Sequence, residues 1–289
     1  VDLVLTAILA NGHVLIEGVP GVAKTLLARL TARLIDADFS RIQFTPDLMP
    51  SDVLGTTVFN MKTNGFDFHQ GPIFADIVLV DEINRAPAKT QAALFEVMEE
   101  RQISIDGTTH RMGDLYTILA TQNPVEQEGT YKLPEAQLDR FLMKITMDYP
   151  SLEEEVNILE RHHTNAALVK LDDITPAITK EEVLSLRAFM NQVFVDRTLL
   201  QYIALIVQQT RTSKAVYLGA SPRASVAMLQ SSKAYALLQG RDFVTPEDIK
   251  FVAPYVLQHR LILTAEAEME GYSPVKVTQR LIDKVEVPK

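Results

Sequence analysis

The chain has 289 residues, of which 47% are hydrophobic, so it can bury the core of one large domain or of two smaller ones. It contains no cysteine, which excludes disulfides and cysteine-ligated zinc sites and fits a reducing compartment. Acidic residues outnumber basic ones, 37 to 28, and tryptophan is absent. Both facts argue against a protein that binds nucleic-acid backbones or stacks on single-stranded bases.

The sequence gives no sign of membrane insertion or secretion. No apolar run approaches the ~18–20 residues of a membrane-spanning helix, and no signal peptide is visible. We therefore expect a cytoplasmic protein without direct membrane insertion and without a nucleic-acid partner, although a local basic patch would leave the second point open. The chain starts inside an apolar helical pattern over residues 1–9, so we expect part of a binding site in an upstream segment.

The first half of the chain alternates short apolar runs with helical patterns, such as the one over residues 25–34. Continuous apolar runs separated by helices are typical of strands in a parallel sheet that is covered on both faces. The sequence therefore predicts an α/β domain with helices on both sides of a parallel sheet. Its predicted strands are residues 13–17, 41–45, 75–80, 116–121 and 144–147.

Two further segments have the pattern of β-hairpins. The turn signals Asn64–Gly65 and Asp106–Gly107 each separate two short strand-like runs, near residues 56–70 and 102–112. Neither hairpin is needed to complete the sheet, so we interpret both as insertions.

Strand patterns largely stop after Pro150, and helical patterns follow. Ser221 and Thr245 each precede a proline, an arrangement that suits the start of a helix. We therefore predict a core domain over residues 1–150 and a helical domain over residues 151–289, whose tail after residue 261 has no clear pattern.

A phosphate-binding loop is indicated after the first strand. The segment Gly18-Val-Pro-Gly-Val-Ala-Lys24-Thr25 fits the pattern G-x-x-x-x-G-K-[ST], with Ala23 in place of the second glycine. Such a loop directs backbone N–H groups and a helix N-terminus at phosphates. Lys24 is expected to reach the β- and γ-phosphates and the Thr25 hydroxyl to bind Mg²⁺. The predicted nucleotide-binding residues of the loop are Gly18, Val19, Pro20, Gly21, Val22, Ala23, Lys24, Thr25 and Leu26.

Alanine suits a positive φ less well than glycine does, so we expect Ala23 to adopt a helical φ at little cost. The alternative for the whole segment is an ordinary Gly/Pro turn followed by a chance Lys-Thr pair.

The apolar strand 75–80 ends in Asp81 and Glu82. A buried strand that delivers two carboxylates is costly unless they meet a cation or water, and the C-terminal ends of parallel strands form the ligand crevice. Asp81 is expected to bind Mg²⁺ together with Thr25, and Glu82 to polarise the attacking water. The alternative is a loop with two solvated acids.

The neighbouring strand 116–121 leads into Gln122-Asn123-Pro124. An amide at this strand end can orient a water near a γ-phosphate, and Asn123 is the candidate. An Asn-Pro pair is also an ordinary turn signal, so without the other motifs the turn would be the preferred interpretation.

Four stretches together resemble the MoxR family of AAA+ ATPases, and the resemblance covers nearly the whole chain. It implies a P-loop NTPase αβα sandwich with a parallel sheet, the AAA+ core, followed by an all-helical lid domain. It also implies ATP as the nucleotide and the two hairpins as insertions of the core. The stretches are the phosphate loop, Val80-Asp-Glu-Ile-Asn-Arg-Ala-Pro87, Ala120-Thr-Gln-Asn-Pro124 and Leu133-Pro-Glu-Ala-Gln-Leu-Asp-Arg-Phe141.

Two arginines match functional positions of that family. Arg140 matches the arginine finger, which acts on the nucleotide of a neighbouring subunit, and Arg223 matches the sensor arginine of the lid. A guanidinium stabilises the charge that accumulates on the γ-phosphoryl oxygens. The simpler alternatives are an ion pair of Arg140 with Asp139 or Glu135, and a surface arginine in the first turn of a helix for Arg223.

The resemblance implies a ring-shaped homo-oligomer, expected to be a hexamer, that uses ATP hydrolysis to mature or assemble protein clients, often with a partner that carries a von Willebrand A domain. In related rings the hairpins face the pore or the client. Phe59, Phe66 and Phe68 alternate on the first hairpin and either pack it onto the domain or contact a client.

Three other classes of protein stay open. A nucleic-acid translocase would share the motor and need a basic pore, and a small-molecule P-loop kinase would need an acceptor pocket in place of a trans arginine. A nucleotide-gated binding module would bind ATP with little turnover.

Overall fold

The computed structural model describes residues 1–123, 131, 133–163 and 171–287. Internal contacts divide the chain into two compact units. The sheet unit comprises Leu15–Lys132 and Thr146–Val183, and the helical unit comprises Val1–Val14, Leu133–Ile145 and Leu184–Lys289. This division by contacts differs from the domain boundary near residue 150, which stays a prediction.

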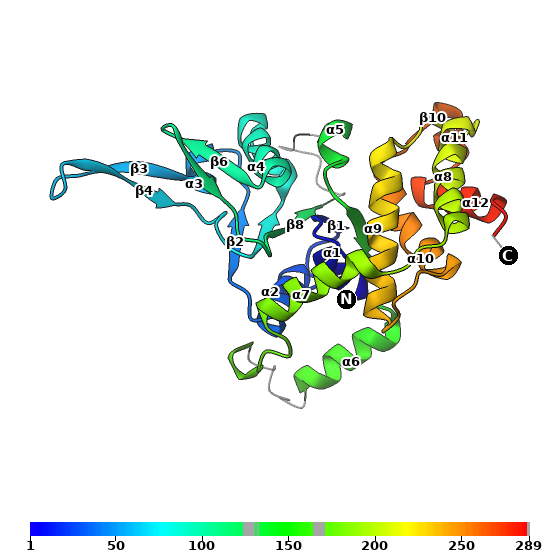
Figure 1. Ribbon diagram of the computed structural model, residues 1–289, viewed down its shortest axis with the longest axis horizontal. Helices are drawn as coiled ribbons and strands as arrows, with labels where there is room; N and C mark the ends of the chain where they lie inside the picture. The colour runs from blue at the N-terminus through cyan, green and yellow to red at the C-terminus, as the bar shows by residue number, and fades with distance from the viewer. Residues whose placement is uncertain (124–130, 132, 164–170, 288–289) are drawn as a thin grey trace. The chain divides into compact units, whose positions relative to one another are not determined.

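A five-stranded sheet has the order β2-β5-β8-β1-β9. Figure 1 labels three of its strands, β1, β2 and β8. The inner strand β5 pairs in parallel with β2 and with β8. All residues of β5 are buried, because helices cover both faces of a parallel sheet. The strands lie within one or two residues of the predicted positions: β1 (Val14–Gly18), β2 (Phe39–Gln43), β5 (Ile77–Asp81), β8 (Thr117–Gln122) and β9 (Met143–Met147).

The helices of the sheet unit connect these strands. Among them, α2 contacts both β2 and β5, and α4 contacts the short helix α3. Their bounds are α2 (Lys24–Leu34), α3 (Pro50–Leu54), α4 (Ala88–Glu100) and α6 (Leu152–His163), with 3₁₀ turns η1 (Ile83–Arg85) and η2 (Leu171–Asp173).

Two antiparallel hairpins occur at the turns singled out in the sequence. They are formed by β3 (Gly55–Asn60) with β4 (Gly65–Gln70), and by β6 (Gln102–Ile105) with β7 (Thr108–Arg111). Asn64 and Asp106 adopt the positive φ that such tight turns require.

The hairpins contact each other through side chains. The Thr57 hydroxyl donates to Asp106 at 2.6 Å, and the Phe68 and His110 ring centroids lie 4.3 Å apart. Phe66, by contrast, is 73% exposed. Phe68 therefore packs between the two hairpins, whereas Phe66 is exposed to solvent.

The helical unit packs around the long helix α9, which contacts α1, α8 and α10. Because α1 packs on α9, the first residues of the chain belong to this unit. Its helices are α1 (Asp2–Leu9), α5 (Glu135–Leu138), α8 (Arg197–Thr212), α9 (Pro222–Leu238), α10 (Pro246–Leu257), α11 (Ala265–Met269) and α12 (Pro274–Lys284), with α7 (Lys180–Phe189) beginning in the sheet unit and η3 (Met190–Gln192) following it.

The capping signals read from the sequence act as predicted. The Ser221 hydroxyl accepts from the Arg223 N–H at the start of α9, and Thr245 forms a capping box with Asp248 at the start of α10. A small antiparallel pair that the sequence analysis did not anticipate joins β10 (Val216–Leu218) to β11 (Ile262–Leu263).

None of the helices in the described part of the chain is long and apolar enough to cross a membrane.

Candidate nucleotide site

The phosphate loop lies between β1 and α2, as the motif requires. Gly18 ends β1, and a Cβ at this position would lie 2.6 Å from the Met147 carbonyl oxygen, so the close approach of β9 demands glycine. Gly21 has a φ of +88°. Lys24 is the first residue of α2, and its ammonium donates to the Gly18 carbonyl at 2.6 Å. The lysine therefore bends back across the mouth of the loop.

Ala23 corrects one expectation. Its φ is +58° and its ψ is +26°, a left-handed conformation rather than the helical one that we expected. The reason is geometric, because the loop must reverse direction immediately before α2 begins. A side chain in this region costs ~1–2 kcal/mol, and such strain persists where the surrounding structure holds it.

The acidic pair lies at the C-terminal end of β5. Asp81 is 7% exposed, and its Oδ1 accepts a hydrogen bond from the Thr121 hydroxyl at 3.0 Å. The same hydroxyl accepts from the Glu82 N–H at 3.0 Å, which ties the end of β5 to β8. Glu82 has a φ of +58°, so its backbone is also left-handed. Glu82 is the N-cap residue of the 3₁₀ turn η1 that follows β5.

Both carboxylates have cationic or amide partners on nearby elements. The Arg41 Nε lies 2.6 Å from Asp81 Oδ2. Glu82 Oε2 accepts from the Gln43 amide at 3.0 Å and from Arg85 Nε at 2.9 Å. Arg41 and Gln43 lie two residues apart on β2 and therefore project from the same face of the strand. Neither Arg41 nor Gln43 was predicted as a site residue from the sequence. The available signal was their alternate spacing on a strand that precedes the acidic strand.

Lys24, Asp81 and Glu82 share one electrostatic environment. Burial lowers the pKa of the Lys24 ammonium, and the charges of Asp81 and Glu82 oppose this effect. The structure therefore brings the lysine of the loop and the acidic pair together from segments far apart in sequence.

The donor set fits Mg²⁺. This ion prefers hard oxygen ligands and few protein carboxylates, and the buried Asp81 carboxylate with the Thr25 hydroxyl supplies that chemistry. Asn123 follows β8 directly and is 6% exposed, so its amide lies at the same end of the sheet as Asp81. Pro124 of the same motif lies outside the described residues.

A cavity of about 660 Å³ adjoins the phosphate loop. This volume suits a small-molecule ligand. The three loop residues of the lining were predicted from the sequence, whereas the lining residues from Met147 to Ile158 were not, and their only signal was the Asp-Tyr-Pro turn after the last strand. The lining residues are Gly21, Val22 and Ala23 of the loop, Met147 at the end of β9, Asp148, Tyr149 and Pro150 after it, and Glu154, Asn157 and Ile158 of α6.

Comparisons with known proteins agree with this geometry. A family model described as "ATPase family associated with various cellular activities (AAA)" matches residues 13–143, and one described as "AAA lid domain" matches residues 208–283. The chain is 44% identical to the chaperone MoxR1 of Mycobacterium tuberculosis, over 100% of this chain and 78% of the relative. The chain belongs to the MoxR family of AAA+ ATPases.

Two further similarities extend this assignment over the full length. The Bacillus subtilis protein YeaC, whose function is uncharacterised, is 49% identical over 99% of this chain and 88% of its own. A crystal structure of a proposed ATPase from Cytophaga hutchinsonii superimposes with a TM-score of 0.90 at 42% identity, covering 100% of this chain and 89% of that chain.

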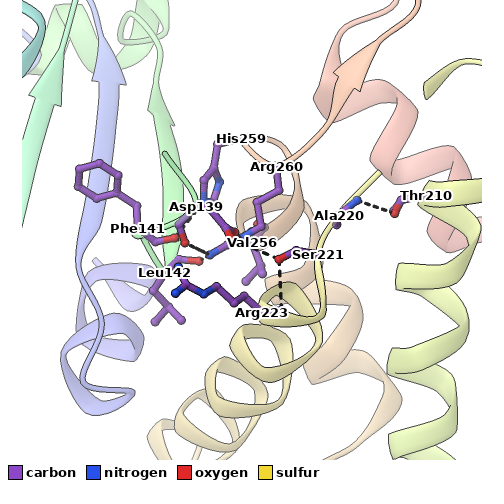
Figure 2. Close-up of polar contacts among 10 residues, drawn as sticks. All are labelled: Asp139, Phe141, Leu142, Thr210, Ala220, Ser221, Arg223, Val256, His259 and Arg260. Atoms are coloured by element: carbon purple, nitrogen blue, oxygen red, sulfur yellow. Dashed lines mark hydrogen bonds and ion pairs between the residues drawn. The ribbon is translucent and has the colours of Figure 1, made fainter. Parts of the chain in front are cut away.

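The two arginines that match functional positions of the MoxR family lie in the helical unit. Arg140 follows α5, and Arg223 lies in the first turn of α9. Asp139, next to Arg140, accepts from the Ser221 hydroxyl at 3.3 Å, and Ser221 caps the helix that carries Arg223 (Figure 2). One carboxylate thus connects the segments that carry both arginines.

The second partner of Asp139 is the buried Arg260, whose Nε lies 2.6 Å from Asp139 Oδ1. Its side chain is 4% exposed and also donates to the carbonyl oxygens of Phe141, at 2.6 Å, and Leu142, at 3.1 Å (Figure 2). Burial lowers the pKa of Arg260, the Asp139 carboxylate opposes this, and the positive charge of Arg223 lowers it further. The Asp139 carboxylate is therefore the anion that offsets the burial of Arg260.

We expect Ala23→Gly to stabilise the protein by ~0.5–1 kcal/mol, because glycine removes the left-handed strain at the cost of a more flexible unfolded chain. Urea unfolding followed by far-UV circular dichroism measures the change. Gly21→Ala is the matched control and should destabilise by ~1 kcal/mol, since its φ is +88° while no atom lies within 4 Å of the added Cβ. Equal stabilities of wild type and Ala23→Gly would show that the loop carries no such strain.

Arg260→Met should destabilise the protein by ~3 kcal/mol, because it leaves Asp139 and several carbonyl groups without their buried donor. Arg280→Met is the control in the same unit. Arg280 lies over the Tyr272 ring at 4.4 Å, a contact worth only ~0.5–1 kcal/mol. Thermal unfolding of both variants compares the two losses, and similar small losses would contradict the anchoring role of Arg260.

Proposed function

We propose that this chain is a Mg²⁺-dependent ATPase that works in a ring-shaped homo-oligomer to remodel protein clients. The observation that carries the proposal is the convergence of Lys24, Asp81 and Glu82 on one site beside the phosphate loop. A nucleotide triphosphate with its cation is the ligand whose charge matches this combination of one lysine, two carboxylates and a helix N-terminus.

Each residue of the site has a role in phosphoryl transfer to water. The loop N–H groups and Lys24 would hold the phosphates, and Thr25 and Asp81 would hold the cation. Bound Mg²⁺ would neutralise charge that develops on the phosphate oxygens. Glu82 accepts the proton of the attacking water, and Asn123 orients that water. The cavity beside the loop, lined by residues after β9, receives the adenosine part of ATP.

Arg140 and Arg223 complete the proposed site by stabilising charge on the γ-phosphoryl group. We propose that Arg140 acts on the ATP of a neighbouring subunit, which requires a head-to-tail interface that closes into a ring, expected to be a hexamer. Arg223 senses the γ-phosphate and passes the change to α9. The shared carboxylate of Asp139 supports coupling between these two arginines.

Protein clients are the proposed substrates of the motor. The Mycobacterium tuberculosis relative is named a chaperone, and the exposed Phe66 on the first hairpin offers an apolar contact for a client chain. A partner with a von Willebrand A domain is part of the proposal through the family alone. The net charge of −9 supports a protein rather than a nucleic acid as the client.

A mixing experiment tests the shared site. The ATPase rate per subunit should fall on dilution, because separated subunits lose the trans arginine. Arg140→Ala and Glu82→Gln should each lose at least ~100-fold in rate. A mixture of these two variants should recover part of the rate, because a Glu82→Gln subunit still donates Arg140 to a neighbour whose Glu82 is intact.

The other outcomes separate the alternatives. Turnover that is independent of concentration and needs a small-molecule acceptor would indicate a P-loop kinase. Tight ATP binding without turnover at any concentration would indicate a nucleotide-gated binding module, and stimulation by DNA that salt abolishes would indicate a translocase. Lys24→Ala serves as the control that abolishes nucleotide binding itself.

A further inference from the structure

Arg41 is the counter-ion of the carboxylate that is proposed to hold the cation. Its Nε lies 2.6 Å from Asp81 Oδ2. The Asp81 side chain is 9% exposed, whereas the Arg41 side chain is 51% exposed. The pair joins neighbouring parallel strands, in which Arg41 is opposite Leu79 and Gln43 is opposite Asp81. An arginine therefore reaches over the end of the sheet to the buried acid.

The two oxygens of Asp81 are both occupied in this arrangement. Oδ1 accepts from Thr121 and Oδ2 accepts from Arg41. Arg41 also donates through Nη2 to the Gln43 amide oxygen at 3.2 Å, and Gln43 donates to Glu82. The Arg41 guanidinium is thus held beside the acidic pair by its hydrogen bonds to Asp81 and to Gln43.

A buried carboxylate without a cationic partner is costly, so Arg41 stabilises the site before any cation binds. A guanidinium does not deprotonate at neutral pH, so the Arg41–Asp81 ion pair cannot break through loss of the arginine's charge. The Arg41 head group must therefore move away if a metal ion binds Asp81 Oδ2. Because half of the side chain is exposed, the displaced head group can rehydrate at little cost.

We propose that Arg41 is a positioning residue that competes with Mg²⁺ for Asp81, holding the carboxylate until the cation displaces it. The proposal rests on the assignment of Asp81 to the cation in the proposed function. It makes Arg41 a determinant of the Mg²⁺ concentration at which the site fills, and not a group that acts on the phosphates.

The test is a titration with Mn²⁺, a paramagnetic substitute for Mg²⁺, followed by electron paramagnetic resonance. Wild type and Arg41→Met are compared with a non-hydrolysable ATP analogue and without nucleotide. Arg41→Met should bind Mn²⁺ about three- to five-fold more tightly in both conditions, the range expected from removing one partly exposed ion pair. Arg41→Lys keeps the charge but loses the fixed fork of donors, so it should fall between them.

Two controls define the site. Arg111→Met removes the same charge from an exposed position on β7 of the same unit and should leave Mn²⁺ affinity within measurement error. Asp81→Asn should remove the titrated site. Circular dichroism of each variant verifies folding, and Arg41→Lys provides the comparison if Arg41→Met does not fold.

Unchanged or weaker Mn²⁺ binding by Arg41→Met would overturn the competition. Weaker binding only with the nucleotide analogue would mean that Arg41 contacts the nucleotide instead. If the proposed function is wrong, the wild type binds no ATP analogue, with or without Mn²⁺. The Mn²⁺ titration without nucleotide would then still test whether Arg41 competes with the cation.

Discussion

The buried carboxylate of Asp81 is the constraint on which the candidate site depends. It ends a strand that is entirely buried, so its charge must be met by partners on the neighbouring strands. Thr121 on β8 and Arg41 on β2 supply those partners and hold the ends of three parallel strands together. The other carboxylate oxygen accepts from Arg41, whose side chain is half-exposed. In the proposed function, the carboxylate that joins the strand ends is also the ligand of the cation.

Two non-glycine residues of the candidate site have a left-handed backbone. Ala23 and Glu82 both adopt left-handed conformations, one immediately before α2 and the other immediately after β5. Ala23 is the N-cap residue of α2, and Glu82 is the N-cap residue of the 3₁₀ turn η1. Such conformations persist where packing on both sides is rigid, as it is around the buried β1 and β5.

In the helical unit, the contacts of Asp139 hold the two segments that carry Arg140 and Arg223. Arg260 forms an ion pair with one carboxylate oxygen of Asp139, and the Ser221 hydroxyl donates a hydrogen bond to the other oxygen. The acid next to Arg140 in sequence is therefore engaged by the helical segments that follow much later in the chain. This contact links the turn that carries Arg140 to the N-terminus of the helix that carries Arg223 (Figure 2).

Local sequence determined the strands, the helix caps, the hairpin turns and the phosphate loop, because apolar periodicity, Asn-Gly and Asp-Gly pairs and the Gly-x-x-x-x-x-Lys-Thr spacing act over a few residues. It also indicated Lys24, Asp81, Glu82 and Asn123, since each follows directly after a recognisable strand or loop. Only the tertiary structure decided the left-handed φ of Ala23, the Arg41–Asp81 pair and the anchoring of Asp139 by Arg260. The φ of Ala23 depends on the path of the folded loop, and the Arg41–Asp81 pair depends on which strands become neighbours. The anchoring of Asp139 depends on a contact between residues 121 positions apart in the chain.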